Sequence, residues 1–419
     1  NEKIGQLVQY SGGWDATGPS SSQGDQHKLN KLKKGEVGSM LNITSVATIR
    51  ETQKIVMENS RLKIPLIFAY DVIHGYKTIF PIPLGESASW DLQLMQKSAE
   101  IAARESAASG LNWTFAPMMD ISRDARWGRI MEGAGEDPFL NAKIGVARIK
   151  GFQGADLSSE FTIAACAKHF AGYGFGEAGR DYNTVNIGLS ELHNTILPPF
   201  KAAAEAGVAT FMNSFNDVDG IPATGHKMLQ RDLLKGQWNY EGLIVSDWGS
   251  IGEMIAHGYA KDKKHAAEIA LNAGSDMDME SYAYEASLET LLAENKITLA
   301  QLNDAVKRVL RLKFQLGLFD DPYKYCDENR EKNEVYTKQN LAIAREAAKK
   351  SIVLLKNDNQ VLPLSKKTKS IAVIGPLAND KDAPLGNWRG KGEYNSAVSL
   401  LEGVTAMADK NTKIYFEKG

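Results

Sequence analysis

Leu243-Ile244-Val245-Ser246-Asp247-Trp248 is a short aliphatic run that ends in a carboxylate and an indole. Apolar or β-branched runs of this length, separated by longer segments of helical period, are typical of βα units around a parallel sheet. Similar runs occur at 37–41, 64–70, 111–117, 162–167, 208–212 and 276–279. Segments of helical period lie between them, at 44–60, 91–109, 138–152, 190–206 and 226–235. The sequence therefore predicts an α/β fold.

Polar side chains mark the ends of most of these runs. They are Asp71, Asp120, Lys168, His169, Asn213, Asn216, Asp247, Asp276 and Asp278. In a parallel barrel the carboxyl ends of the strands converge on one face, which carries the active site, whereas in an open sheet they spread along an edge. The alternative is that these residues simply begin loops. Seven or eight βα units within about 315 residues favour a (β/α)8-like TIM barrel with its site at one end.

The chain divides into two parts at a charged segment. Its 419 residues, 43% of them apolar, are enough for two or three domains with cores. An amphipathic helix at 299–316 is followed by a charged stretch without apolar period, so we expect a barrel over 1–317 and a linker over 318–339. A helix and a buried strand at 370–374 then open a second α/β domain over 340–419, with its second strand at 413–416. Because this part is too short to bury a core, we expect the second domain to be truncated.

Composition argues against several classes of partner. A net charge of −2, from 49 basic and 51 acidic side chains, does not suit a nucleic-acid or polybasic membrane partner. Cys166 and Cys326 are too few for a disulfide framework, and the seven histidines lack zinc-ligand spacing, so we expect no metal. Gly174-Phe175-Gly176-Glu177-Ala178-Gly179 fits a GxGxxG pattern, but no helical period follows it, so we expect no dinucleotide and no other cofactor.

The pair Asp247-Trp248 suggests the chemistry of the site. A carboxylate at the end of an apolar strand is costly unless it is paired or used, and a buried structural aspartate is the alternative. An aromatic face beside a carboxylate suits the C–H face of a sugar ring. Asp71 and the cluster Arg123-Asp124-Ala125-Arg126-Trp127-Gly128-Arg129 add acceptors and bidentate donors for hydroxyls. Most charges of this cluster are expected to form structural ion pairs, with one reaching a ligand.

Lys168-His169 supplies two further polar groups at the end of the fourth run. Adjacent residues on a strand point to opposite sides, but at a turning strand end both side chains can reach one pocket. The two groups suit hydroxyls, a carboxylate or a phosphate. A barrel enzyme for a phosphorylated metabolite would need a glycine-rich phosphate loop after the late strands, and the glycines of 247–280 are scattered. A noncatalytic sugar-binding barrel remains another alternative.

Six motifs, in their order along the chain, resemble glycoside hydrolase family 3, and most closely its bacterial periplasmic β-glucosidases. They are Ala69-Tyr70-Asp71-Val72-Ile73-His74-Gly75, Ser122-Arg123-Asp124-Ala125-Arg126-Trp127-Gly128-Arg129, Gly135-Glu136-Asp137-Pro138, Lys168-His169-Phe170, Met212-Asn213-Ser214-Phe215-Asn216 and Val245-Ser246-Asp247-Trp248. The resemblance covers essentially the entire chain. It implies a (β/α)8-like barrel joined to an (α/β)6 sandwich, a retaining mechanism without cofactor, and a periplasmic or secreted location.

The resemblance also implies roles for individual residues. Asp247 matches the nucleophile of the family. Residues that match those gripping the sugar hydroxyls are Asp71, Arg129, Lys168 and His169, and residues that match the pocket lining are Met212 and Trp248. Phe215 departs from the more usual Tyr, so the ionisation of Asp247 is expected to rest on neighbours such as Arg129.

The acid/base of the retaining mechanism is not evident in the sequence. In the β-glucosidase branch it is a Glu of the second domain, which is expected beyond the end of this chain. The β-N-acetylglucosaminidase branch uses a His where this chain has Tyr173, and β-xylosidases often carry Glu where it has Asp71. The sequence therefore predicts a β-D-glucosidase acting on β-glucosides or β-gluco-oligosaccharides, with those two branches as alternatives; it leaves the oligomeric state open.

Overall fold

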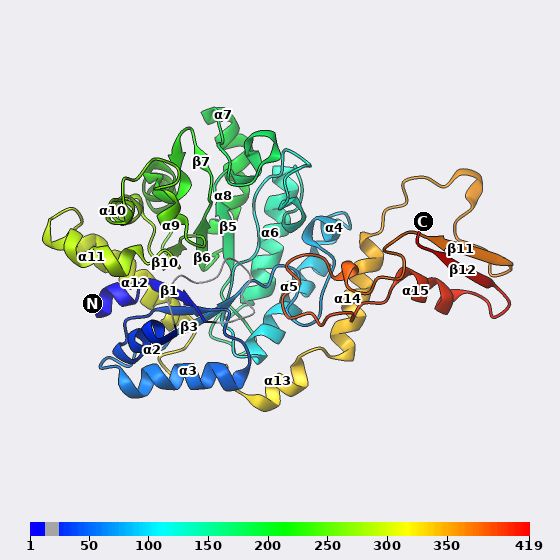
Figure 1. Ribbon diagram of the computed structural model, residues 1–419, viewed down its shortest axis with the longest axis horizontal. Helices are drawn as coiled ribbons and strands as arrows, with labels where there is room; N and C mark the ends of the chain where they lie inside the picture. Colours follow the sequence, from blue (N-terminus) through cyan, green and yellow to red (C-terminus); the bar gives the residue numbers. More distant parts are fainter. Residues whose placement is uncertain (13–24) are drawn as a thin grey trace.

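The computed structural model describes residues 1–12 and 25–419, and a barrel of parallel strands forms its centre (Figure 1). The barrel strands are β1 Val8–Ser11, β2 Ser39–Leu41, β3 Ile67–Tyr70, β4 Trp113–Thr114, β5 Cys166–Phe170, β6 Thr210–Asn213, β9 Leu243–Val245 and β10 Asp278–Met279. A hairpin of β7 Asp217–Val218 and β8 Ile221–Pro222 lies outside the barrel ladder.

The strands close into a ring through two parallel sheets and three single bridges. One sheet has the order β10-β1-β2-β3-β4 and the other β5-β6-β9. Parallel bridges from Trp113 to Ala164, from Met118 to Lys168 and from Val245 to Met277 join the two sheets at both seams. The predicted (β/α)8-like barrel is therefore confirmed. The carboxyl ends of all its strands meet at one face.

Most predicted runs begin two or three residues before the strands they correspond to, and two errors in the strand prediction are larger. β1 was missed, because Val8–Ser11 is a short strand in which Gln9 and Ser11 are polar yet buried, so no apolar run announces it. The fourth predicted run, 162–167, begins too early, because Ile163 hydrogen-bonds to Phe152 before the ladder starts. β5 consequently contains Lys168 and His169, which were expected to follow the strand. An apolar run shows which residues are buried, and here the buried segment extends beyond the residues that pair with the neighbouring strands.

Helices surround the barrel, and each of them except α7 contains buried residues. They are α1 Glu2–Gly5, α2 Asp25–Lys34, α3 Val46–Asn59, α4 Pro83–Ser87, α5 Leu92–Ala108, α6 Pro138–Gln153, α7 Leu189–Glu191, α8 Leu197–Glu205, α9 Ser250–Glu253, α10 Lys263–Ala273, α11 Ala283–Ala293 and α12 Leu299–Gln315. Side chains of Asp91, Asp137 and Asp262 cap three of them by accepting a backbone N–H of the first turn. In the described ranges, no helix combines the length and apolarity that crossing a bilayer requires.

A second α/β unit follows the barrel at the right of Figure 1. The predicted linker 318–339 contains a short helix, α13 Glu328–Glu334, and is followed by α14 Lys338–Ser351. Parallel strands β11 Ser370–Ile374 and β12 Lys413–Glu417, with α15 Leu400–Met407, then form the start of the predicted second domain.

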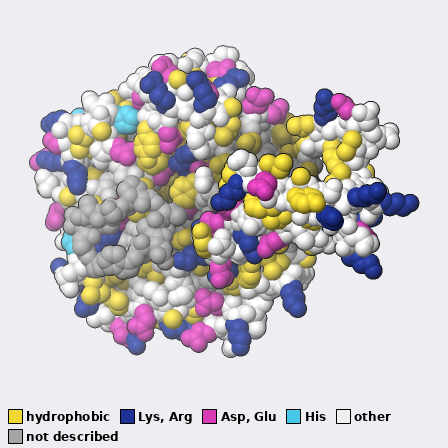
Figure 2. Space-filling view, turned by 45° about the vertical axis from the view of Figure 1, so that its right-hand side comes forward, with side chains coloured by type: hydrophobic (Ala, Val, Ile, Leu, Met, Phe, Trp, Pro, Cys, Tyr) yellow, Lys and Arg dark blue, Asp and Glu magenta, His cyan; other side chains and the backbone are white. Residues whose placement is uncertain are grey.

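The burial predicted for the strand at 370–374 was wrong. Val373 is the only buried residue of β11, because neither face of the two-stranded sheet is fully covered within the described residues. Apolar side chains consequently reach the surface of this unit, as Figure 2 shows, with Leu355 91% exposed.

Lys313 is a buried cation that we expect to weaken the barrel. Its side chain on α12 is fully buried, and Lys313 Nζ donates to the amide oxygen Oε1 of Gln6 at 2.6 Å. Burial lowers the pKa of Lys313 from 10.5 to about 7. Between these values the unfolded chain binds the extra proton, so Lys313 costs stability that is recovered as pH rises, roughly 4 kcal/mol at pH 7.

Lys313→Met is therefore expected to raise the free energy of unfolding at pH 7. The net gain is about 2 kcal/mol, because Gln6 loses its partner. The gain should shrink from pH 7 towards pH 10, which thermal melts across this range measure. Lys307→Met, on the exposed side of the same helix, is the matched control and should change stability by less than about 0.5 kcal/mol. If the gain in the free energy of unfolding stays constant with pH, the cost does not come from burying the charge of Lys313.

Candidate active site

A cavity of about 230 Å³ opens at the carboxyl ends of the barrel strands. That volume is below the about 300–1,000 Å³ of drug-sized sites and suits one small ring. Seven of the eight residues predicted for the site line it: Asp71, Arg129, Lys168, Met212, Phe215, Asp247 and Trp248. The eighth, His169, lies behind Asp247 with its Nε2 3.5 Å from Oδ2. The structure thus brings all eight together from six different strands or strand-end loops.

Asp247 follows β9 and lines the cavity with a largely buried carboxylate. The backbone N–H of Trp248 donates to Oδ1 at 2.7 Å, while Oδ2 is buried without a hydrogen bond. Burial raises the pKa of Asp247 to about 6, and the charges of Arg129 and Lys168 limit that rise. An ionised carboxylate that lines a pocket and is flanked by two cations has the properties of a nucleophile.

Lys168 and Arg129 form a charged network around the other side of the cavity. Lys168 Nζ donates to Asp71 Oδ1 at 3.1 Å and lies 3.9 Å from Glu132 Oε2. Arg129 donates from Nε and Nη2 to the two oxygens of Glu132, at 2.6 and 3.0 Å. Both cations are therefore held in place before any ligand arrives, which favours binding of several hydroxyls at once.

His169 is oriented by a carboxylate that the site prediction did not include. Both its backbone N and its Nδ1 lie within hydrogen-bonding distance of Asp120 Oδ2, at 2.9 and 2.8 Å. Burial and the nearby cations lower the pKa of His169 well below its usual range, while burial raises the pKa of Asp120 to about 8. The ladder between β5 and β6 is irregular after Ala167, and this irregularity accompanies the approach of both Lys168 and His169 to one site.

Six further lining residues come from outside the motifs: Leu41, Phe115, Asp181, Tyr182, Met279 and Trp388. Tyr182 and Asp181 lie in the loop after β5, where the Tyr182 ring packs 4.3 Å from that of Phe215 and Asp181 accepts the indole N–H of Trp127 at 2.8 Å. Trp388 comes from the second α/β unit. It lies in an aperiodic loop, so neither strand-end position nor helical period could have identified it.

The charged cluster 123–129 behaves as the sequence suggested. Arg123 pairs with Glu191, and Arg126 pairs with Asp124 at 2.6 Å, all on the exposed side. Arg129 alone among its charged residues lines the cavity.

Glu253 is a second titratable carboxyl close to the nucleophile. It ends α9, and its Oε2 is buried without a hydrogen bond. Burial and the charge of Asp247 raise the pKa of Glu253 to about 7. A carboxyl that is about half protonated at neutral pH has the chemistry of a general acid.

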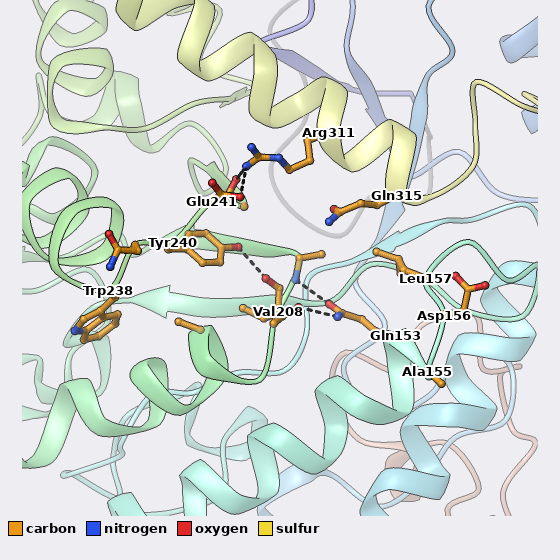
Figure 3. Close-up of a pocket in the computed structure, with 16 residues that line it drawn as sticks. Gln153, Ala155, Asp156, Leu157, Val208, Trp238, Tyr240, Glu241, Arg311 and Gln315 are labelled. Carbon is orange, nitrogen blue, oxygen red and sulfur yellow. Dashed lines mark hydrogen bonds and ion pairs between the residues drawn. The ribbon is translucent and has the colours of Figure 1, made fainter.

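A wider cavity of about 630 Å³ lies at the other end of the barrel (Figure 3). Its hydrogen bonds are made within the protein: Gln153 bonds to Ala209 and Gly207, the Tyr240 hydroxyl donates to Val208, and Arg311 pairs with Glu241 at 3.3 Å. These contacts tie helix ends to strand starts. Residues at the amino-terminal face of such barrels stabilise the fold and do not take part in catalysis.

Comparisons with known proteins agree with this geometry. The model of the glycosyl hydrolase family 3 N terminal domain matches residues 1–312, and that of the family 3 C-terminal domain matches residues 352–416. A periplasmic beta-glucosidase of Salmonella typhimurium is 41% identical over 100% of this chain and 54% of its own length. A beta-xylosidase of Formosa agariphila is 34% identical over 88% of the chain and 55% of its own length.

Solved structures of beta-glucosidases also match this chain. A beta-glucosidase from Listeria innocua in complex with isofagomine matches with a TM-score of 0.92 and 41% identity, over 100% of this chain and 58% of that one. The chain thus spans somewhat more than half the length of these relatives. The resemblance drawn from the motifs is confirmed.

Proposed function

Because this chain belongs to glycosyl hydrolase family 3, we propose that it is the glucose-gripping and nucleophile-carrying part of a retaining β-D-glucosidase. In this proposal 1–317 is the barrel, 318–339 the linker and 340–419 the opening of a second domain. The substrates are β-glucosides or β-gluco-oligosaccharides, cleaved at their nonreducing end. The periplasmic name of a 41% identical relative supports a periplasmic or secreted location.

The observation that carries the proposal is the buried carboxylate of Asp247, which lines a sugar-sized cavity between two cations, Arg129 and Lys168. We assign this carboxylate the attack on the anomeric carbon: a glycosyl ester forms, the bond to the aglycone oxygen breaks, and water later hydrolyses the ester with net retention. Trp248 offers an aromatic wall beside the reacting carbon. Developing positive charge on the ring is favoured by the carboxylate that faces it.

The gripping residues are placed to bind a pyranose by its hydroxyls. Asp71 is an acceptor, Arg129 and Lys168 are donors, and the Nε2 of His169 lies 3.5 Å from Asp247 Oδ2 behind the cavity wall. Met212 and Phe215 add apolar surface for the C–H groups of the ring. The set suits a neutral polyhydroxylated ligand, because the two cations are already balanced by Glu132 and Asp71.

The experiment that tests the proposal is covalent trapping. Incubation with an activated 2-deoxy-2-fluoro-glucoside should give one adduct, and peptide mass spectrometry should place it on the peptide containing Asp247. The fluorine slows hydrolysis of the ester while the activated leaving group departs unaided. An adduct on another carboxylate would overturn the assignment. Binding without hydrolysis by the full-length protein would instead favour a noncatalytic sugar-binding barrel.

A β-xylosidase is the second candidate, favoured by the 34% identical relative of that name. The two sugars differ in the hydroxymethyl group, which only glucose carries. We expect Asp71 to lie beside this group, so that the longer side chain of Asp71→Glu would occupy its space.

Asp71→Glu in the full-length protein is therefore expected to shift specificity. The ratio of kcat/KM for an aryl β-glucoside over the matching β-xyloside should fall at least about tenfold. Asp124→Glu, at an exposed aspartate that pairs with Arg126, is the matched control and should leave the ratio unchanged. Equal losses on both sugars would show that Asp71 does not read the hydroxymethyl group.

A further inference from the structure

Glu132 is a fully buried carboxylate behind the cavity, and no ligand needs to touch it. It ends the short helix Ile130–Glu132, and its side chain is 0% exposed. Arg129 donates a hydrogen bond to each of its two oxygens, and Lys168 Nζ lies 3.9 Å from its Oε2. Burial alone would raise the pKa of Glu132, but these cations and a hydrogen bond from Trp388 hold it below its usual range. The carboxylate is therefore the common partner of three cavity residues.

Trp388 reaches Glu132 from the other domain. Its loop is fastened to the barrel by backbone contacts: the Nε2 of His74 lies 2.6 Å from the carbonyl of Asn387, and the N–H of Lys391 donates to Tyr76 at 2.6 Å. Gly390 packs so closely that an added Cβ would lie 2.7 Å from the Gly75 carbonyl. Trp388 itself has φ +53°, a conformation that a bulky residue keeps only when its surroundings impose it.

The indole completes the cation network as well as the cavity wall. Arg129 lies 5.8 Å and Lys168 5.7 Å from the centre of the Trp388 ring. Both distances lie within the range of cation–π attraction. The same two cations thus contact the carboxylate of the barrel and the indole of the second domain.

We propose that Glu132 is the positioning residue that couples docking of the second domain to the grip on the sugar, an inference that rests on the proposed function. One carboxylate fixes Arg129 and Lys168 and receives the Trp388 N–H, so the indole seats only where the cations are in place. Without the negative charge, the two cations lose their shared partner and turn towards Asp71 and Asp247. The loop would then lose its anchor inside the cavity.

The test uses the full-length protein with Glu132→Gln, Trp388→Phe and the double variant. Glutamine keeps the shape and phenylalanine keeps a ring, but each removes the charged hydrogen bond. Each single variant should raise the Kd of isofagomine about tenfold. The Kd of the double variant should be no higher than the higher of the two single-variant values, because both substitutions break the same contact. KM should rise with kcat nearly unchanged, whereas partial misfolding would lower kcat alone.

A second measurement follows the loop without any sugar. Trypsin cleavage after Arg389 or Lys391 should be at least about threefold faster in Glu132→Gln, because local opening exposes the loop. Asp276→Asn is the matched control: it breaks another buried pair, with Lys235 at 2.5 Å, outside the cavity, and should alter neither readout.

Two results would overturn the inference. Multiplicative effects of Glu132→Gln and Trp388→Phe on the Kd would show independent action, and an unchanged Kd and cleavage rate in Glu132→Gln would show no positioning role. If the unmodified protein itself fails to bind isofagomine, the proposed function fails instead. The cleavage rate still reports on docking in that case.

Discussion

Asp247→Ala is expected to lower kcat/KM for aryl β-glucosides by about 10⁴-fold or more in the full-length protein. The loss follows from the removal of the oxygen that forms the glycosyl ester. The side chains around it keep their own partners, since Arg129 is held by Glu132 and Lys168 by Asp71. The variant should therefore still bind the sugar, and kcat should fall far more than affinity.

Chemical rescue separates this loss from a structural one. Azide fits the space that alanine leaves, attacks the anomeric carbon from the same side, and should restore turnover with the α-glucosyl azide as product. Asp181→Ala, which removes another carboxylate of the cavity, is the control; it should lose less than about a hundredfold and gain nothing from azide. Rescue of neither variant, or a β-azide product, would count against Asp247 as the nucleophile.

Most of the barrel could be predicted because its strands are apolar runs that end in polar residues. The run at 243–245 matches β9 in both bounds. β1 could not be found in this way, because its buried Gln9 donates a hydrogen bond to Ser39 across the ladder, which no local pattern reveals. The observed bounds of the strands differ from the predicted ones for the same reason. Pairing depends on the neighbouring strand, whereas the apolar pattern reports only burial.

The candidate site also contains residues that could be predicted from the sequence and residues that could not. Residues at strand ends, such as Asp71 and Asp247, share a face by the geometry of a parallel barrel, so their meeting could be predicted. Trp388 and Glu132 meet only because a loop of the second unit docks on the barrel. That docking rests on backbone hydrogen bonds, and these carry no side-chain signature in the sequence.

The second large effect concerns protonation of the leaving group. A retaining glycosidase needs a second carboxyl about 5–5.5 Å from the nucleophile, acting as general acid. In the described residues Asp71 and Glu132 are both committed to cations, which suits binding and not proton donation. We propose that neither of them is the acid/base, a role for which the family resemblance implies a Glu of the second domain.

The chain of residues 1–419 is accordingly expected to react at Asp247 only with glucosides whose leaving group departs unaided. Glucosides with poor leaving groups should react about 10²–10⁴-fold more slowly than with the full-length protein, since that is the usual worth of general acid help. Rates of adduct formation against leaving-group pKa, compared between the two proteins, measure this. If alkyl glucosides react equally well with both, the acid lies within this chain. Glu253, with its pKa raised to about 7 by burial and by Asp247, would then carry that role, and Glu253→Gln would remove the reaction with alkyl glucosides alone.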